Sequence, residues 1–186
     1  MPLSKDPSLQ GRVVIVTGGN RGLGREMALA LLECGAHVAV TSQAGGESLA
    51  AMEKDARALG AGEVLALQGD VADWSDCQRV VAETEARFGA VDVLINNAGR
   101  GMRLISETFN TVPTKFWQAN VAAWKEIMDV NVNGTFLMAR AATPAMVARG
   151  FGKIINISTS EITMTRQGYT PYGPSKTAIE ACSQAW

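Results

Sequence analysis

The chain has 186 residues, 47% of them hydrophobic, and carries a formal net charge of −1. This length and composition predict a folded domain rather than a disordered chain. The sequence has no basic block and no apolar run of the roughly 20 residues that cross a bilayer, so neither nucleic acid nor a membrane is expected as a partner. Its three cysteines show no CxxC spacing and no clustering with histidine, which predicts reduced thiols in a cytoplasmic protein and no metal site.

The first predicted unit is a strand followed by a glycine-rich turn and a helix. The stretch RVVIVTGG, residues 12–19, is a β-branched run that ends in glycines, as a buried parallel strand does. Gly35 ends the helix that follows. That helix is predicted from apolar residues that recur at helical spacing: Leu23, Met27, Ala30, Leu31 and Cys34.

The rest of the chain repeats this alternation. Further strands are expected at 36–42, 63–68, 91–99 and 152–159. Helices are expected at 47–60, from an N-cap at Asp73 to about Phe88, from about Val121 to Arg149 with interruptions near Gly134 and Pro144, and from about Tyr172. Strands separated by helices form βαβ units with right-handed crossovers. The sequence therefore predicts an α/β fold with a doubly wound parallel sheet, in a single Rossmann-like, three-layer α/β/α domain over residues 1–186.

The turn TGGNRGLG, residues 17–24, has Gly18, Gly22 and Gly24 in the pattern GxxxGxG, which is related to dinucleotide-binding glycine loops. Glycines let the backbone approach a pyrophosphate without a Cβ in the way, and the following helix offers free N–H groups to the phosphates. The alternative is an ordinary glycine-rich turn. The position of residues 17–24 between the first strand and the first helix favours nucleotide binding over this alternative.

The end of the second strand bears on which dinucleotide binds. NAD sites usually place a carboxylate there for the ribose hydroxyls, whereas this chain has Ser42 and Gln43. Arg21 in the glycine turn has a guanidinium that suits a 2′-phosphate. NADP(H) is therefore the predicted cofactor and NAD(H) the second choice. The alternatives are a solvated loop charge at Arg21 and a simple turn residue at Ser42.

Several motifs together resemble those of the short-chain dehydrogenase/reductase family. They are TGGNRGLG as its cofactor turn, GDVAD (69–73) after its third strand, NNAG (96–99) at the end of its fourth strand, DVNVNG (129–134) around its active-site asparagine, and YGPSK (172–176) as its YxxxK motif. They follow in the family's order over essentially the whole chain. The resemblance implies cofactor contacts at Thr17, Gly18, Asn20, Arg21, Gly22, Leu23, Gly24, Ser42, Asp70, Val71, Asn97, Ala98, Gly99, Tyr172 and Lys176.

The only two tyrosines of the chain, Tyr169 and Tyr172, lie just before Lys176. A tyrosine pKa of about 10 suits acid–base catalysis poorly at neutral pH, but a nearby ammonium group favours the phenolate. Tyr172 and Lys176 are one helical turn apart, and Pro174 is tolerated in a first helical turn. Tyr169 lies before Pro171, outside the helix, and is expected to line the pocket.

The resemblance also implies catalytic roles. Tyr172 would exchange a proton with the substrate oxygen, while Lys176 holds the nicotinamide ribose and lowers the tyrosine pKa. Asn131 would help to retain a water in the proton relay. The nearby Asn133 is interpreted as a residue that caps or bridges the interrupted helix.

In this family a serine after the fifth strand commonly binds the substrate oxygen. The matching position here is Thr159, flanked by Ser158 and by Ser160, which is the second choice. Threonine offers the same donor and acceptor. The alternative is that these hydroxyls satisfy local backbone groups.

The segment between NNAG and Trp124 is longer than is usual in the family, and it contains Phe109, Phe116 and Trp117. These aromatic residues are expected to wall a pocket, to form a subunit contact or to pack over neighbouring helices. The chain ends at Trp186, so the last strands of the family fold are expected to be missing. A homodimer or homotetramer is expected for the full-length protein.

Two functions follow as hypotheses. The first is an oxidoreductase that transfers a hydride between NADP(H) and a carbonyl or secondary alcohol of a small-molecule substrate, with Tyr172 and Lys176 as its acid–base pair. The alternative is a non-catalytic NAD(P)-binding sensor, or a fragment of a longer dehydrogenase. Hydrolase and kinase functions are excluded because the sequence has neither a GxSxG elbow nor a GxxxxGK[ST] loop.

Overall fold

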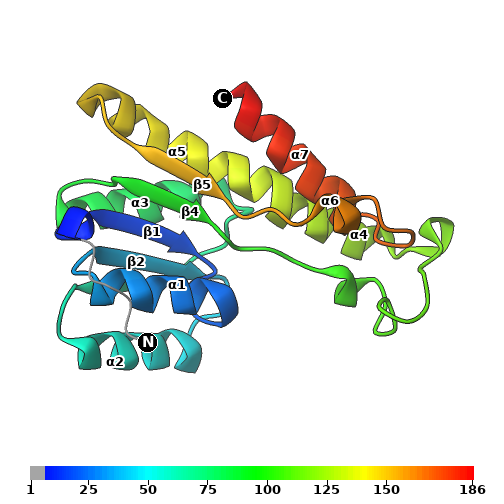
Figure 1. Ribbon diagram of the computed structural model, residues 1–186, viewed down its shortest axis with the longest axis horizontal. Coiled ribbons are helices and arrows are strands. Elements are labelled where there is room, and N and C mark those ends of the chain that lie inside the picture. Colours follow the sequence, from blue (N-terminus) through cyan, green and yellow to red (C-terminus); the bar gives the residue numbers. More distant parts are fainter. Residues whose placement is uncertain (1–6) are drawn as a thin grey trace.

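One parallel sheet of five strands forms the centre of the molecule (Figure 1). The computed structural model describes residues 7–186, so residues 1–6 of the predicted domain lie outside the described residues. The strands are β1 Val13–Thr17, β2 His37–Ser42, β3 Val64–Gln68, β4 Val93–Asn96 and β5 Lys153–Asn156. They lie in the order β3-β2-β1-β4-β5, which confirms the predicted doubly wound parallel sheet.

The α-helices are α1 Gly22–Glu33, α2 Glu47–Leu59, α3 Trp74–Phe88, α4 Val121–Met128, α5 Gly134–Arg149, α6 Glu161–Met164 and α7 Tyr172–Ala185. A π-helix, η4 Asp129–Asn133, joins α4 to α5, and three short 3-10 turns are η1 Pro7–Leu9, η2 Met102–Leu104 and η3 Phe116–Gln118. The sequence did not predict the short elements η1, η2, η3 and α6. No helix within residues 7–186 is both long and apolar enough to cross a bilayer.

Helices cover both faces of the sheet because successive strand residues point to opposite sides. One apolar cluster joins Val14 to Leu32 of α1 and Met52 of α2. The other joins Ile15, the next residue along β1, to Met138 of α5 and to α3. In Figure 1, α1 and α2 lie below the strands and α5 lies above them, while α3 lies behind β4. These two clusters hold β1 between two layers of helices.

The strand order reverses at β1, which pairs with β2 on one side and with β4 on the other. Ile15, for example, is in register with Ala39 of β2 and with Leu94 of β4. The connections after β1 and β4 therefore leave the sheet in opposite directions. A crevice forms at the carboxyl ends of the strands at such a switch point.

Helix α1 forms where predicted, but its buried face is different. Leu23 is 61% exposed, whereas the residues that face the sheet are Gly24, Ala28 and Leu32, which are spaced by four. The difference arises because a glycine starts this buried row, and a glycine is not counted in an apolar pattern. Leu23 lies in the first turn of the helix, where its side chain reaches the mouth of the cavity described below.

The predicted break near Gly134 is confirmed as the π-helix η4, which ends just before it. A Cβ on Gly134 would lie 2.7 Å from Val71 Cγ2, so only a glycine allows the helix to approach the end of β3 this closely. The predicted break at Pro144 is wrong, because α5 continues through it. Pro144 is exposed, so water can bind the carbonyl that has lost its N–H partner.

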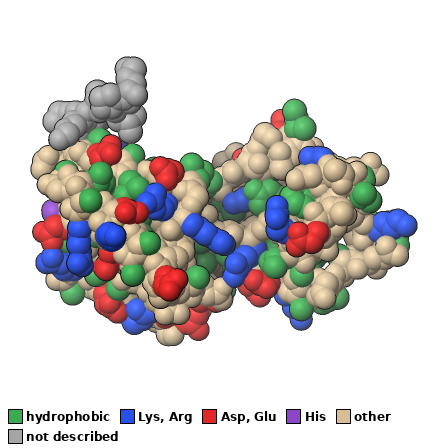
Figure 2. Space-filling model, turned by 90° about the horizontal axis from the view of Figure 1, so that it is seen from below, with side chains coloured by type: hydrophobic (Ala, Val, Ile, Leu, Met, Phe, Trp, Pro, Cys, Tyr) green, Lys and Arg blue, Asp and Glu red, His purple; other side chains and the backbone are tan. Residues whose placement is uncertain are grey.

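Residues 101–120 extend away from the sheet and pack against residues 166–170 (Figure 1). The Tyr169 hydroxyl donates to Asn110 Oδ1 at 2.7 Å, and the Tyr169 ring lies 5.6 Å from that of Phe109. Tyr169 is therefore buried inside this lobe, and it is not among the residues that line the cavity at the glycine turn described below. Its expected place in a substrate pocket stays a prediction. Phe116 and Trp117 are 67% and 68% exposed. Other hydrophobic side chains are scattered over the face of the molecule shown in Figure 2.

The corrected face of α1 is tested by a pair of leucine substitutions. Leu32→Ala should lower the free energy of unfolding by about 2–5 kcal/mol, because it opens a cavity in the core. Leu23→Ala, the matched control, should change it by less than about 0.5 kcal/mol. Urea unfolding of the two variants measures both values. Equal losses would contradict the orientation of α1 described here.

Candidate functional site

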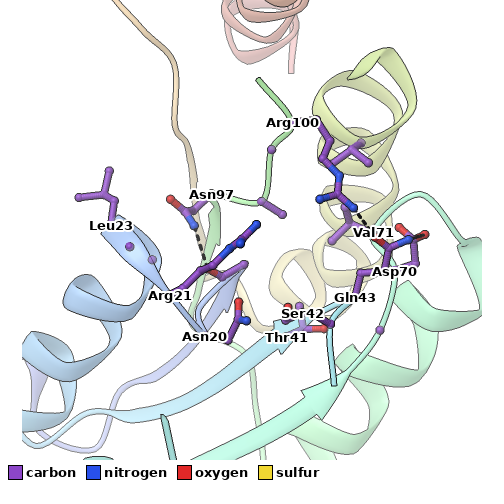
Figure 3. A pocket seen from close by; sticks show the side chains of 18 residues that line it. Asn20, Arg21, Leu23, Thr41, Ser42, Gln43, Asp70, Val71, Asn97 and Arg100 are labelled. Carbon is purple, nitrogen blue, oxygen red and sulfur yellow. Dashed lines mark hydrogen bonds between the residues drawn. The ribbon is translucent and has the colours of Figure 1, made fainter. Parts of the chain in front are cut away.

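A cavity of about 540 Å³ opens at the carboxyl ends of the strands next to the glycine turn (Figure 3). Its volume lies within the range of about 300–1,000 Å³ that is usual for ligand sites. Most of the predicted cofactor residues line it: Gly18, Asn20, Arg21, Gly22, Leu23, Gly24, Ser42, Asp70, Val71, Asn97, Ala98 and Gly99. Six lining residues were not predicted as site residues, namely Thr41, Gln43, Ala44, Gly69, Arg100 and Val130. Thr17, Tyr172 and Lys176 are not among the residues that line it.

The glycine turn packs tightly against the end of β4. Gly18 has a φ of +64°, and a Cβ on Gly24 would lie 2.4 Å from the Gly18 carbonyl oxygen and 2.4 Å from Asn97 Nδ2. Asn97 Nδ2 donates to the Thr17 carbonyl at 2.9 Å and to the Gly18 carbonyl at 3.3 Å. Glycine at positions 18 and 24 is therefore required for the close approach of β1, α1 and β4.

The N-terminus of α1 can receive an anion. Its N-cap residue Arg21 makes no side-chain capping bond, and its first turn has no acidic residue. The first N–H groups of the helix therefore lack a side-chain cap, and they carry the positive end of the helix dipole. Because Gly22 and Gly24 leave the backbone open to the cavity, this turn fits the pyrophosphate of a dinucleotide.

Two threonines that are in register on neighbouring strands, Thr17 and Thr41, have different environments. Thr17 Oγ1 accepts hydrogen bonds from the N–H groups of Asn97 and Ala98, both at 3.0 Å. Thr41, its register partner on β2, is 1% exposed, and its Oγ1 has no hydrogen-bond partner within residues 7–186. Thr17 thus fixes the turn after β4, whereas Thr41 presents an unsatisfied hydroxyl at the cavity lining.

A polar chain crosses from the end of β2 to the end of β4. Gln43 Nε2 donates to Asp70 Oδ2 at 2.8 Å, while Gln43 Oε1 accepts from a guanidinium N–H of Arg100. Arg100 Nε also lies 2.9 Å from Glu126 Oε1. The only sequence signal for Arg100 is its position directly after NNAG. Its partners are distant in sequence, and its contacts could not be foreseen.

Asn131 lies in the π-helix and is completely buried. Its Oδ1 accepts from the Arg100 N–H at 2.7 Å, and its Nδ2 donates to the Arg100 carbonyl at 3.0 Å and to Ser175 Oγ at 2.9 Å. Asn133, in contrast, is exposed and donates to Asp129 Oδ1. The interpretation of Asn133 as a residue that bridges the helix agrees with this contact.

Tyr172 and Lys176 lie in the first turns of α7, with Pro174 between them as predicted. Lys176 Nζ lies 5.9 Å from the centroid of the Tyr172 ring and donates to the Ile157 carbonyl at 2.7 Å. Lys176 is only 5% exposed, and this burial lowers its pKa. The helix therefore holds a buried amine beside the phenol, next to the end of β5.

The three hydroxyls after β5 differ in their bonding. Ser158 Oγ donates to Glu180 Oε1 at 2.8 Å, and Ser160 Oγ caps α6 by accepting from the Thr163 N–H. Thr159 makes no hydrogen bond through its hydroxyl to any of residues 7–186. Of the two predicted candidates, Thr159 is therefore the one whose hydroxyl is available.

The sheet order, the glycine turn and the helix N-terminus without a side-chain cap together define a Rossmann-like α/β protein with a cavity at its switch point. The chain belongs to the short-chain dehydrogenase family, whose family model matches residues 12–186.

Proteins similar to this chain include a short-chain type dehydrogenase/reductase of Picea abies, 36% identical over 92% of this chain and 62% of the relative. Another is the 3-oxoacyl-[acyl-carrier-protein] reductase FabG of Staphylococcus aureus, 32% identical over 89% of this chain and 63% of the relative. The chain thus spans less than two thirds of the length of these curated relatives.

The chain is also similar to solved structures of dehydrogenases and oxidoreductases. A metagenomic short-chain oxidoreductase in complex with NADP superposes with a TM-score of 0.84 at 31% identity, over 96% of this chain and 76% of that one. An NAD⁺-bound xylitol dehydrogenase also gives a TM-score of 0.84, at 26% identity, over 95% of this chain and 64% of that one.

The unequal bonding of the two threonines can be measured. Thr17→Val should lower the free energy of unfolding by about 1–3 kcal/mol, because two backbone N–H groups lose their acceptor. Thr41→Val should leave it unchanged or raise it by up to about 1 kcal/mol, since an unsatisfied hydroxyl is replaced by a methyl group. Chemical denaturation of both variants provides the comparison. A loss at Thr41 as large as that at Thr17 would contradict the unsatisfied state of Thr41.

The lowered pKa of Lys176 predicts a dependence of stability on pH. Between this lowered pKa and the ordinary value of 10.5, the unfolded chain binds the proton that the folded chain has released. Stability attributable to this lysine therefore rises with pH through that window. The free energy of unfolding of the wild type, relative to Lys176→Met, should increase as the pH approaches 10.5. If the free energy of unfolding had the same pH dependence in the two proteins, the lowered pKa of Lys176 would be refuted.

Proposed function

We propose that this chain carries the cofactor site and the acid–base residues of an NADP(H)-dependent oxidoreductase, which interconverts a carbonyl and a secondary alcohol on a small molecule. The observation that carries the proposal is the buried amine of Lys176, 5.9 Å from the ring centroid of Tyr172. Burial of an amine costs free energy, so its place beside a phenol favours a role in proton transfer over a role in packing.

The residues of the cavity suit a nicotinamide dinucleotide. The N–H groups at the start of α1, next to Gly22 and Gly24, would hold the pyrophosphate. Arg21 and Ser42 would hold the 2′-phosphate, because no carboxylate ends β2. When bound, the dinucleotide supplies a hydride for carbonyl reduction or accepts one in alcohol oxidation. The similarity to a short-chain oxidoreductase solved in complex with NADP supports this choice.

Proton transfer is proposed for Tyr172. During reduction its hydroxyl gives a proton to the carbonyl oxygen, and during oxidation the phenolate takes the proton back. The Lys176 side chain donates to the Ile157 carbonyl. When it is protonated, its positive charge favours the phenolate form of Tyr172. In the same proposal, Lys176 also holds the ribose of the nicotinamide.

Two further side chains complete the proposed site. The Thr159 hydroxyl would bind the substrate oxygen, because Ser158 and Ser160 already use their hydroxyls elsewhere. Asn131 would position the proton relay, since its amide links the segment after β4 to Ser175 on the tyrosine helix. Both residues would act on the reaction by orienting the groups between which the proton moves.

The two tyrosines provide a matched test of this mechanism. Tyr172→Phe should lower turnover of aldehyde or ketone substrates by at least about 100-fold, because the proton donor is lost. The dissociation constant for NADPH should not change. Tyr169→Phe, the control, removes a hydroxyl that only binds Asn110 and Arg166, and it should retain turnover. Steady-state kinetics with a panel of carbonyl compounds measures both. Full turnover in Tyr172→Phe would overturn the proposed role of Tyr172 as proton donor, whereas binding of NADPH without any turnover in the unmodified protein would favour the non-catalytic binding function.

The cofactor is tested by calorimetric titration of NADPH and NADH into the chain. Tighter binding of NADPH is expected, because Arg21 offers charge-assisted hydrogen bonds to the 2′-phosphate. Tighter binding of NADH would retain the oxidoreductase class and overturn the preference for NADP. Failure of both dinucleotides to bind would contradict the proposed function itself.

A further inference from the structure

We infer that Arg100 is a second residue that selects NADP(H), acting with Arg21 from the opposite side of the 2′-phosphate. This inference rests on the proposed function, and it concerns a residue that no sequence motif had singled out. Arg21 and Arg100 are the two cationic side chains that line the cavity, and Asp70 is the one anionic residue among the lining residues.

The starting point of the Arg100 side chain is fixed. Both backbone polar groups of Arg100 bind the amide of Asn131, at 2.7 and 3.0 Å, and Asn131 is completely buried. A side chain that begins at a backbone held in this way loses less conformational freedom when its end binds a ligand. Arg100 is therefore better placed to recognise a ligand than an arginine on an unrestrained loop.

The end of the Arg100 side chain reaches the strand that discriminates between the two dinucleotides. Its guanidinium donates to Gln43 Oε1, and Gln43 directly follows Ser42, the last residue of β2. Figure 3 shows Arg21 and Arg100 on opposite sides of the cavity, with Ser42 below and between them and Gln43 directly below Arg100. A 2′-phosphate held at the end of β2 would thus have a guanidinium on each side.

The present partners of Arg100 leave it free to bind an anion. A guanidinium has five N–H donors, and here it contacts one neutral amide oxygen and one carboxylate, Glu126. Exchange of the amide for a phosphate would replace a neutral hydrogen bond by charge-assisted ones, which are roughly twice as strong. The ribose hydroxyl of NAD(H) offers no such gain. Arg100 would therefore favour NADP(H).

Gln43 also binds Asp70, the one carboxylate among the residues that line the cavity. Its Nε2 donates to Asp70 Oδ2 at 2.8 Å, while Asp70 Oδ1 accepts from the Ala72 N–H at 2.9 Å. Asp70 is thus held by two donors on its own side of the cavity. Its negative charge is partly compensated there, and Arg100 forms its ion pair with Glu126 instead.

The test compares Arg100→Gln with Arg103→Gln by measuring dissociation constants for NADPH, NADH, 2′-AMP and 5′-AMP calorimetrically. Arg103 is the matched control because its side chain is 76% exposed and does not line the cavity. Arg100→Gln should weaken NADPH and 2′-AMP by about 10- to 100-fold, and NADH and 5′-AMP by less than about fivefold. Arg103→Gln should change none of them.

Several outcomes would overturn the inference. Equal weakening of NADPH and NADH by Arg100→Gln would mean that Arg100 contacts the part common to both, such as the adenine ring. No weakening of either would mean that it contacts neither. Arg100→Lys keeps the charge and serves where Arg100→Gln does not fold; it should still weaken NADPH more than NADH, and an equal effect would again overturn the inference. If the unmodified chain binds neither dinucleotide, the proposed function fails instead.

Discussion

The buried amide of Asn131 is the contact on which both halves of the site depend. It binds the backbone of Arg100 on one side and the hydroxyl of Ser175 on the other. Ser175 Oγ in turn donates to the Tyr172 carbonyl at 2.7 Å. One side chain thus connects the segment that follows β4, which lines the cavity, to the helix that carries Tyr172 and Lys176. A fully buried amide with all of these partners satisfied is expensive to disturb, so the spacing between the two halves is well fixed.

The π-helix explains how Asn131 reaches this position. Helices α4 and α5 would form one continuous helix, but η4 inserts a wider turn between them. Such turns are rare and occur frequently at functional sites. The Thr135 hydroxyl donates to the Asn131 carbonyl at 2.8 Å, and Gly134 allows the close contact with Val71. The wide turn is therefore supported from the helix side and from the sheet side.

Much of the fold could be predicted from the sequence because its signals are local. β-Branched runs mark the strands, Asp73 caps α3 as expected, and the glycine pattern marks the turn after β1. The errors arose where contacts between distant segments or with solvent determine the local structure. The buried row of α1 begins at a glycine that packs against another segment, and Pro144 is tolerated because it faces solvent.

The candidate site likewise contains residues that the sequence motifs indicated and contacts that only the structure shows. Its motif residues were predictable, whereas Arg100 contacts Gln43 across 57 positions in the sequence and Tyr169 belongs to the lobe formed by the insertion. The choice of Thr159 became possible only when the partners of its neighbours were known. The substrate, the oligomeric state and the cytoplasmic location stay predictions, because side-chain contacts within one chain do not reveal them.

The lobe formed by residues 101–120 and 166–170 also has a consequence for local stability. It is joined internally by the hydroxyl and backbone contacts of Tyr169, Arg166 and Thr114, and its aromatic pair Phe116 and Trp117 faces solvent. The sheet, in contrast, is covered by apolar clusters on both faces. Regions with few buried apolar contacts open at lower free energy than the core. Backbone amides of this lobe should therefore exchange with deuterium well before those of β1 and β2, so the lobe can open while the glycine turn remains closed.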